Sequence, residues 1–331
     1  MKTVAILGAG FIGNVHADAI QKSKTLKLAA FVQREGEKAK TAAEKFGVPC
    51  FADAEEMLAK VNPDILDICL PSFYHEEFVC LAAKHKKHVI CEKPFSLSSD
   101  ACSRMVKACA DAGVHFMVAQ VLRWFPEYMK IKELLPKLGS LHGVYCTRLA
   151  QHPNWTTWHR DPKISGGGLF DLHLHEIDYL YSVFGEVDHV YAAGWKNPTG
   201  CWNHVLSTLV FKNGVKVQAE GGSEMIGNYP FSASFRATGD NGTLDYKLSA
   251  GFNIENLGAA SNKLTFFEKD KEPAAVEWTA GDGFQLELEA YADSVETGKP
   301  VPIPPENSVY VIKIIEALQR SLETGKTERI Q

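Results

Sequence analysis

Short, unbroken apolar segments alternate with amphipathic segments along the first third of the chain. The apolar segments have the length of strands, and the amphipathic segments have apolar residues at helical spacing. Unbroken apolar strands joined by helices are typical of a parallel sheet that is covered on both faces. The pattern predicts strands at residues 2–7, 28–33, 64–70, 88–91 and 115–120, and helices at 11–21, 38–46, 76–85 and 98–112.

Beyond residue 185 the pattern changes to alternating apolar and polar residues, which is typical of strands with one exposed face. Asn213-Gly214 separates two such segments and predicts a tight hairpin. Two later segments, 284–295 and 311–322, have apolar residues at helical spacing and are predicted to be core helices. The predicted strands at 205–211, 215–219, 231–238, 243–248 and 263–268 form a largely antiparallel sheet with one face available.

The composition excludes several classes of protein. The 331 residues are 45% apolar and 23% charged, as in a globular enzyme with more than one core. The net charge of −5 provides no basic field to attract nucleic acid or an anionic membrane. No apolar run would span a bilayer, and the N-terminal run reaches glycines too early for a secretory signal, so we expect a cytoplasmic protein. The 8 cysteines form no C-x-x-C pair, which favours buried thiols over disulfides or zinc ligands.

The first predicted turn has the sequence GAGFIG and lies between a strand and a helix. This context turns a common glycine pattern into a dinucleotide-binding motif. Gly8 permits the tight turn, Gly10 lets the backbone approach a pyrophosphate, and Gly13 lets the helix pack close to the sheet. The helix N-terminus then binds the anion through free N–H groups, with Phe11 and Ile12 in the same loop. We therefore predict an N-terminal Rossmann domain that binds NAD(P).

The end of the second strand determines which dinucleotide is preferred. Gln33 occupies the position where an NAD-binding protein usually has an acid, and Arg34 follows it. A neutral residue does not repel a 2′-phosphate, and an arginine pairs with one, which favours NADP slightly over NAD. In the alternative interpretation, Arg34 is a solvated loop residue and Glu35 takes the place of the acid.

A second group of polar residues has helical spacing. Asp171, His175 and Asp178 are at positions i, i+4 and i+7 of a helix predicted to begin near Gly168, so they share one face. Residues 166–168 are glycines, which let substrate or backbone approach closely. Two acids and a histidine opposite an apolar stripe predict a polar cleft. The opposite stripe consists of Leu169, Leu172, Ile177 and Leu180.

A metal site is the rival interpretation of this region. Histidines are dense here, with Asp171 and Glu176 close by, but His173 and His175 are two residues apart and so point to different sides of a helix. No H-E-x-x-H motif is present, and we favour a site without metal. The histidines concerned are His152, His159, His173 and His175.

Three segments together resemble the glucose–fructose oxidoreductase / inositol dehydrogenase (Gfo/Idh/MocA) family. They are GAGFIG at 8–13, CLPSFYHEEFVCLAAKHKKHVICEKP at 69–94, and GGGLFDLHLHEIDYLYSVFG at 166–185. The resemblance implies a Rossmann domain at 1–123 and, at 124–331, an α+β domain whose open, largely antiparallel sheet carries the substrate site and subunit contacts. It also implies NAD(P)-dependent oxidation or reduction of a sugar, polyol or inositol-like substrate, in a homodimer or homotetramer.

The resemblance also assigns roles to residues near the expected reacting atoms. Lys93 follows a buried strand, at the end of the sheet where ligands bind, and would point at the reacting hydroxyl and the nicotinamide. His175 would be the acid/base, with Asp171 as its neighbour at the substrate, whereas Asp178 would be structural. Pro94 ends the strand, and the preceding peptide bond would be cis.

Further residues would line the cofactor and the substrate. Leu70, Pro71, His75, Glu92 and Gln120 would lie along the dinucleotide, although the family usually has asparagine at the position of Gln120. His75 would alternatively be a solvated residue at a helix N-terminus. Arg123 and Trp158 would contact the substrate. Aromatic faces and polar groups in the loop that contains Trp158 suit sugar recognition, but in the alternative interpretation the loop packs on the sheet. The loop carries Trp155, Trp158, Arg160 and Asp161.

Two other functions remain open at this point. One is a glycosidase of the same fold that oxidises its substrate transiently with tightly held NAD. The other is a catalytically silent dinucleotide sensor, which would not need Lys93, Asp171 and His175 together.

Overall fold

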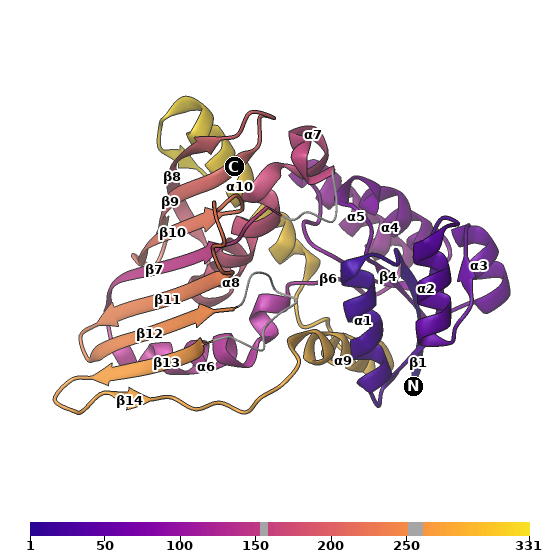
Figure 1. Ribbon diagram of the computed structural model, residues 1–331, viewed down its shortest axis with the longest axis horizontal. Coiled ribbons are helices and arrows are strands. Elements are labelled where there is room, and N and C mark those ends of the chain that lie inside the picture. Colours follow the sequence, from indigo (N-terminus) through magenta and orange to yellow (C-terminus); the bar gives the residue numbers. More distant parts are fainter. Residues whose placement is uncertain (153–157, 251–260) are drawn as a thin grey trace. The chain divides into compact units, whose positions relative to one another are not determined.

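The computed structural model describes residues 1–152, 158–250 and 261–331, and the chain forms two compact units (Figure 1). The first unit contains Met1–Trp124 and Gly281–Tyr310, and the second contains Phe125–Ala280 and Val311–Gln331. The division expected from the sequence assigned all of 124–331 to the second domain. Residues 281–310 instead return to the first unit because the apolar stripe of their helix is part of its core.

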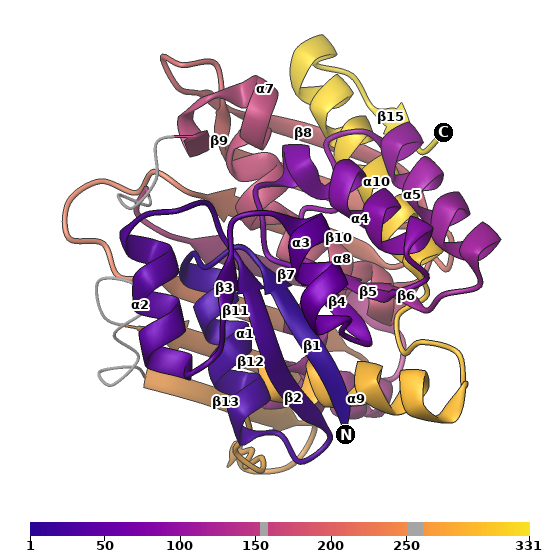
Figure 2. The same cartoon turned by 90° about the vertical axis from the view of Figure 1, so that its right-hand side faces the viewer.

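The first unit is built on the predicted parallel sheet, with six strands in the order β3-β2-β1-β4-β5-β6 (Figure 2). The strand order reverses direction between β1 and β4, which is where open α/β sheets bind ligands. The short strand β3 and helix α3 were not predicted from the pattern. The elements are β1 Lys2–Leu7, α1 Phe11–Lys22, β2 Leu26–Val32, α2 Glu37–Phe46, β3 Cys50–Phe51, α3 Ala54–Val61, β4 Ile65–Ile68, α4 His75–Lys84, β5 His88–Cys91, α5 Ser99–Ala112, β6 Phe116–Val118 and α9 Gly283–Thr297.

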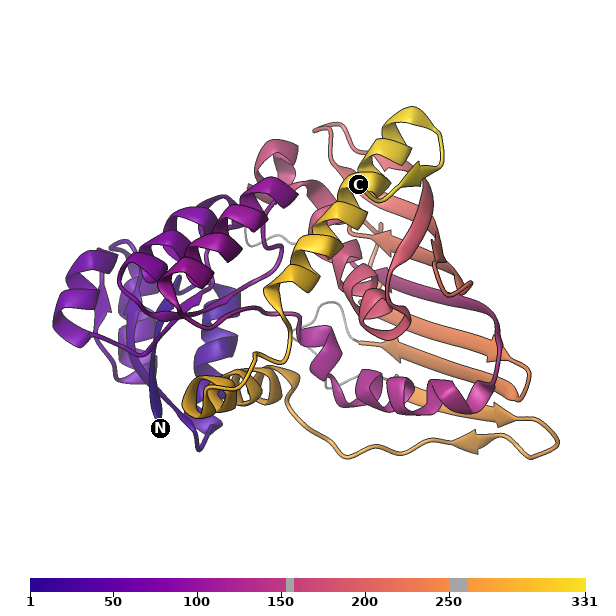
Figure 3. The same cartoon turned by 180° about the vertical axis from the view of Figure 1, so that it is seen from behind.

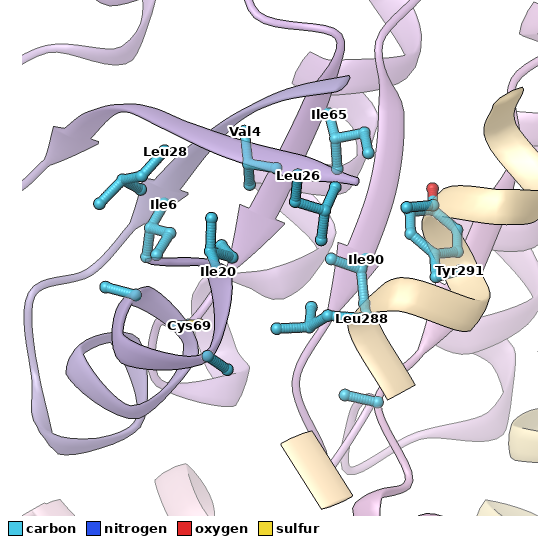
Figure 4. Close-up of a cluster of buried hydrophobic side chains, with 14 of the residues drawn as sticks. Val4, Ile6, Ile20, Leu26, Leu28, Ile65, Cys69, Ile90, Leu288 and Tyr291 are labelled. Carbon is cyan, nitrogen blue, oxygen red and sulfur yellow. The ribbon is translucent and has the colours of Figure 1, made fainter. Parts of the chain in front are cut away.

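Helix α9 completes one core of the first unit. Figure 4 shows Leu288 and Tyr291, from α9, beside Ile90 of β5, and all three are buried. The Tyr291 hydroxyl donates a hydrogen bond to the carbonyl of His115 at 3.0 Å. Burial of large apolar side chains is the main stabilising term here, at about 1.5–3 kcal/mol for each fully buried side chain. This helix therefore belongs to the dinucleotide-binding sheet despite its distance in sequence.

The second unit contains the mixed, mostly antiparallel sheet, with nine strands in the order β14-β13-β12-β11-β7-β10-β9-β8-β15. Among the described strands of this second sheet, only the β7–β10 pair is parallel. The predicted hairpin is present between β9 and β10. The strands are β7 Leu141–Leu149, β8 Val187–Lys196, β9 Trp202–Phe211, β10 Lys216–Gly222, β11 Ser232–Gly239, β12 Gly242–Ser249, β13 Ser261–Glu268, β14 Ala274–Ala275 and β15 Glu328–Arg329.

One face of this sheet is covered by helices and the other is open. Along β9, Val205, Leu209 and Phe211 are buried, whereas Leu206 is 47% exposed. Figure 3 shows the helices gathered on the covered face. No helix within the described ranges is long and apolar enough to cross a membrane. The helices are α6 Pro126–Leu134, α7 Pro162–Ser165, α8 Leu174–Phe184 and α10 Pro305–Thr324, the last of which runs from the first unit into the second.

Candidate active site

The glycine turn after β1 requires glycine at its first and last positions. Gly8 has φ +105°, and a Cβ there would lie 2.5 Å from the carbonyl oxygen of Cys69. A Cβ on Gly13 would lie 1.9 Å from the carbonyl oxygen of Gly8. Both contacts are with backbone, so no side-chain movement would relieve them. The turn is therefore held in one shape by close packing of α1 against β1 and β4.

Gly10 differs from these two glycines because a Cβ built on it has no atom within 4 Å. It is the N-cap of α1, where no side chain accepts a hydrogen bond from the helix and the first turn has no acidic residue. The positive end of the helix dipole favours an anion at this position. An open approach at the N-terminus of a helix fits the pyrophosphate of a dinucleotide.

The side chain of Gln33 is part of the same loop. Its Oε1 accepts a hydrogen bond from the backbone N–H of Ala9 at 3.0 Å. The amide orientation is therefore fixed, and the Nε2 group is the part that remains to donate. Arg34 and Glu35, the other two candidates for ribose recognition, are exposed.

His75 is not solvated: it is fully buried, and this alternative is wrong. Its Nε2 lies 2.8 Å from the carbonyl oxygen of Leu70, and its Nδ1 lies 3.1 Å from that of Phe95. Burial lowers the pKa of His75. The ring therefore ties the segment after β4, with Leu70 and Pro71, to the segment after β5, and both of its nitrogens are engaged within the protein.

Glu92 and Lys93 lie directly after β5, as expected. Glu92 is 6% exposed, whereas Lys93 is partly exposed. The Lys93 backbone N–H donates to Oε2 of Glu92 at 2.9 Å, and the Lys93–Pro94 peptide is cis. The glutamate thus folds back onto the peptide of its neighbour, and only the lysine side chain is left at the carboxyl end of the strand.

Gln120 follows β6, and its side-chain oxygen Oε1 is buried. The residue is 2% exposed, and its backbone N–H donates to Oε1 of Glu287 at 2.6 Å. Its Oε1 has no hydrogen-bond partner within the described part of the chain. A buried acceptor without a donor is costly, and a ligand amide would supply the donor. Together with the open cradle at Gly10, this atom fits a nicotinamide dinucleotide. Arg123 lies in the turn of 3-10 helix that follows, Val121–Trp124.

The second unit carries the other predicted site residues, on a helix that differs from the expected one. Leu169–His173 is a π-helical turn, and the α-helix α8 begins only at Leu174. Asp171 and His175 are partly exposed, but Asp178 is fully buried. Asp178 therefore does not line an exposed polar stripe with Asp171 and His175, and its burial agrees with the structural role expected for it. The π-helical turn that contains Asp171 alters the position of Asp171 relative to the residues of α8.

Polar groups surround Asp171. Its Oδ2 lies 3.8 Å from Nδ1 of His159, and the rings of His159 and Trp158 stack with centroids 3.8 Å apart. Arg160 donates to Nε2 of His152 at 3.1 Å. His159 thus lies between Trp158 and Asp171 and contacts both side chains. Trp155 lies outside the described residues.

A glutamate that the sequence reasoning missed fixes the glycine-rich segment before Asp171. Oε1 of Glu224 accepts from the side-chain amides of Asn197 at 2.9 Å and Asn203 at 2.8 Å. Oδ1 of Asn203 in turn accepts from the Gly168 backbone N–H at 2.7 Å. A Cβ on Gly168 would lie 2.3 Å from Oγ of Ser223. At Gly168, the space that a Cβ would need is thus taken by the side chain of Ser223.

Two of the residues proposed for a metal site in this region, His173 and Glu176, have other partners. His173 is buried, its Nε2 lies 2.8 Å from Oγ of Ser207, and burial lowers its pKa to about 4. Glu176 is paired with the buried Arg148 at 2.7 Å. In the described residues, His, Cys and acidic ligand atoms gather within metal-binding distance only at His16, Asp67 and Cys69.

Comparison with known proteins identifies the family. Residues 2–120 match the model of the "Oxidoreductase family, NAD-binding Rossmann fold", and residues 128–245 match the "GFO/IDH/MocA C-terminal domain". The chain is 28% identical to D-xylose 1-dehydrogenase (NADP(+)) 2 of Haloferax volcanii, over 97% of each chain. It is 24% identical to myo-inositol 2-dehydrogenase of Thermotoga maritima, over 99% of this chain and 98% of that protein.

A solved structure has the same fold throughout. Aldose-aldose oxidoreductase of Caulobacter crescentus, crystallised with glycerol, superposes with a TM-score of 0.87 over 99% of each chain, at 21% identity. The first family match covers all six strands of the parallel sheet, and the second covers β7 to β11 and the start of β12. The glycine turn, the lysine after β5 and the two sheets therefore have one explanation: the chain belongs to the GFO/IDH/MocA family of NAD(P)-dependent oxidoreductases.

Proposed function

We propose that this protein is a dehydrogenase or reductase that transfers a hydride between NAD(P) and a CH–OH group of a sugar, polyol or inositol-like substrate. The observation that carries the proposal is the cradle at Gly10, with the buried acceptor of Gln120. Full-length similarity to D-xylose and myo-inositol dehydrogenases supports the substrate class.

The proposed chemistry divides between three side chains. A bound dinucleotide would accept or supply the hydride. Lys93, as a cation, stabilises the negative charge that develops on the substrate oxygen. His175 takes up the hydroxyl proton, and Asp171 holds the imidazole or a substrate hydroxyl.

Further residues are proposed to contact the cofactor and the substrate. Gly8, Gly13, Phe11 and Ile12 shape the pyrophosphate loop, with Leu70, Pro71 and Glu92 along the dinucleotide. His75 would act through the carbonyls that it holds, since its ring nitrogens are engaged. Arg123 and Trp158 are proposed to contact the substrate.

We propose a modest preference for NADP, which is supported by the orientation of Gln33. Its Oε1 is occupied by Ala9, so Nε2 donates, and a donor suits a 2′-phosphate as well as a hydroxyl. Gln33→Glu should reverse the preference, because a carboxylate repels the phosphate and accepts from the 2′-hydroxyl of NAD. Dissociation constants for NADPH and NADH, measured on both proteins, test this. An unchanged ratio would show that Gln33 does not select the cofactor.

We also propose that the open face of the nine-stranded sheet joins copies of the chain into a homodimer or homotetramer. Tyr191, Trp195 and Leu206 are 43%, 51% and 47% exposed on β8 and β9. Tyr191, Ala193 and Trp195 alternate along β8 and therefore share one face, and Leu206 of β9 lies opposite Ala193 on that face. Light scattering after size-exclusion chromatography tests the assembly, with Leu206→Glu as the variant expected to dissociate it. A monomeric parent protein would refute the proposal.

A substrate panel tests the proposed reaction. D-xylose, D-apiose and myo-inositol, the substrates named by the relatives, would each be incubated with NAD⁺ and NADP⁺. Sugar-dependent accumulation of the reduced cofactor is expected with at least one pair. A glycosidase with tightly held NAD would cleave a glycoside without net reduction, and a sensor would bind the dinucleotide without turnover.

A further inference from the structure

A buried cluster of ionisable groups lies beneath the glycine turn. His16, on the second turn of α1, is fully buried between two carboxylates. Its Nδ1 lies 2.9 Å from Oδ2 of Asp67, which is also fully buried, and its Nε2 lies 3.0 Å from Oε1 of Glu92. The thiol of Cys69 donates to the other oxygen of Asp67 at 3.3 Å. The cluster thus joins α1, the end of β4 and the end of β5.

The geometry indicates the charge of the imidazole. The Nδ1 contact is a hydrogen bond, and the Nε2 contact has ion-pair distance without hydrogen-bond geometry. The carboxylate of Asp67 at Nδ1 favours a hydrogen on that nitrogen, and the two carboxylates at 2.9 and 3.0 Å attract a positive ring. Burial opposes the charge, but the carboxylate of Asp67 outweighs it and raises the pKa of His16 well above its ordinary value. The geometry and the neighbouring charges therefore favour a buried imidazolium.

The cluster reaches Lys93 through one carboxylate. Oε1 of Glu92 faces His16, and Oε2 accepts the backbone N–H of Lys93. The carboxylate is held at both oxygens, so its position fixes where the chain leaves β5. We propose that His16 is a positioning residue: it anchors Glu92, and thereby sets the location of the Lys93 side chain relative to the cofactor loop on α1. This inference rests on the proposed role of Lys93.

A bound metal is the competing explanation, since Nδ1 of His16, Asp67 and Cys69 are close enough to share an ion. Two features favour the ion pair. Glu92 faces the other nitrogen, so it could not share the same ion with Nδ1. Burial raises the pKa of the Cys69 thiol, so the sulfur is held as a donor to Asp67 and not as a thiolate ligand.

The first test reads the charge of His16 directly and needs no substrate. Nitrogen NMR of histidine-labelled protein at pH 8, with the resonances assigned through loss in His16→Gln, reports whether each ring nitrogen carries a hydrogen. Two protonated nitrogens are expected. A neutral ring, or a stoichiometric metal in the purified protein by elemental analysis, would overturn the inference.

The second test reads the position of Lys93 without turnover. Competitive acetylation followed by mass spectrometry gives the reactivity of Lys93 relative to the exposed Lys27. His16→Gln should change this ratio by about threefold or more, because the environment of the amine changes. Ile20→Ala is the matched control: it removes a buried side chain from the same helix and should lower stability while leaving the ratio unchanged. An unchanged ratio in His16→Gln would refute positioning.

Kinetics then separate this inference from the proposed function. With the substrate and cofactor that the panel identifies, His16→Gln should lower kcat by about tenfold or more. In a Lys93→Met background it should cause no further loss, because the two residues act in series. If His16→Gln lowers kcat by the same factor in the Lys93→Met background as in the wild-type protein, His16 does not act through Lys93 and has a purely structural role. Full activity of Lys93→Met alone would refute the proposed function instead, and the NMR and labelling results would be unaffected.

Discussion

An added methyl group is predicted to have different effects at Gly10 and Gly13. At Gly10 it should weaken cofactor binding and leave the stability nearly unchanged, whereas at Gly13 it should destabilise the fold. At Gly10 the backbone is extended, with φ −80° and ψ −168°, and the new Cβ has no atom within 4 Å. Gly10→Ala should therefore change the free energy of unfolding by less than about 1 kcal/mol. The methyl group would instead occupy the approach of the pyrophosphate. Loss of one or two hydrogen bonds to charged phosphate, about 1.5–3 kcal/mol each, predicts at least a tenfold rise in the dissociation constant of NADPH.

At Gly13 the new Cβ would lie 1.9 Å from the Gly8 carbonyl oxygen, where ordinary contacts are 3.4 Å or longer. Because the obstacle is backbone, α1 would have to move away from β1. Overpacking of this kind costs about 3 kcal/mol or more. Gly13→Ala should thus be strongly destabilised, and its loss of cofactor binding should accompany its loss of structure.

Urea unfolding and NADPH titration by fluorescence, carried out on both variants, distinguish the two effects. Gly113→Ala is the control, since this residue caps α5 with φ +67° and has no neighbour within 4 Å of a built Cβ. It should lose about 1 kcal/mol of stability through backbone strain and bind NADPH normally. Normal NADPH affinity in Gly10→Ala would refute the assignment of the loop, and normal stability in Gly13→Ala would refute the packing argument.

Three further substitutions test the chemistry and the core. Lys93→Met should reduce kcat by about a hundredfold or more with the cofactor dissociation constant nearly unchanged, as measured by steady-state kinetics and titration; wild-type turnover would reject the assigned role. His175→Ala should remove an ionisation near neutral pH from the rate profile, and an unchanged profile would reject the assigned base. Burial lowers the pKa of His173 from 6.5 to about 4. The unfolded chain therefore binds a proton more readily than the folded protein, and the free energy of unfolding falls as the pH drops from 6.5 toward 4, by on the order of 3 kcal/mol in all. His173→Gln should flatten the fall in unfolding free energy over this range, and an equally steep fall would show that other groups cause it.

The order of apolar and polar residues was sufficient to predict five of the six strands of the first sheet and five of the nine strands of the second. Parallel strands buried on both faces give unbroken apolar runs, and the helices between them have regular spacing, so both are visible locally. Strand β7 was missed because its last residues include the buried polar Thr147 and Arg148, which interrupt the pattern. Their burial is possible only because Glu176, from α8, pairs with Arg148. No window of sequence contains both partners.

The candidate site shows the same division. The positions of the glycine turn and of the lysine after β5 were predictable because they depend on a few adjacent residues and on the end of a strand. The π-helical turn that contains Asp171 was not predictable, because spacing alone assumes a regular α-helix. The burial of Asp178 depends on what packs against α8, which no spacing shows.

The sequence by itself thus determined the order of elements, the family and the residue types available for chemistry. Only the tertiary structure decided that residues 281–310 complete the first core, and that His16, Asp67 and Glu92 meet in one buried cluster. The physical reason is that local pattern reflects hydrogen bonding and burial along one segment. The charge of a buried histidine depends instead on groups that approach it from other strands, and their approach is settled only when the sheet has formed.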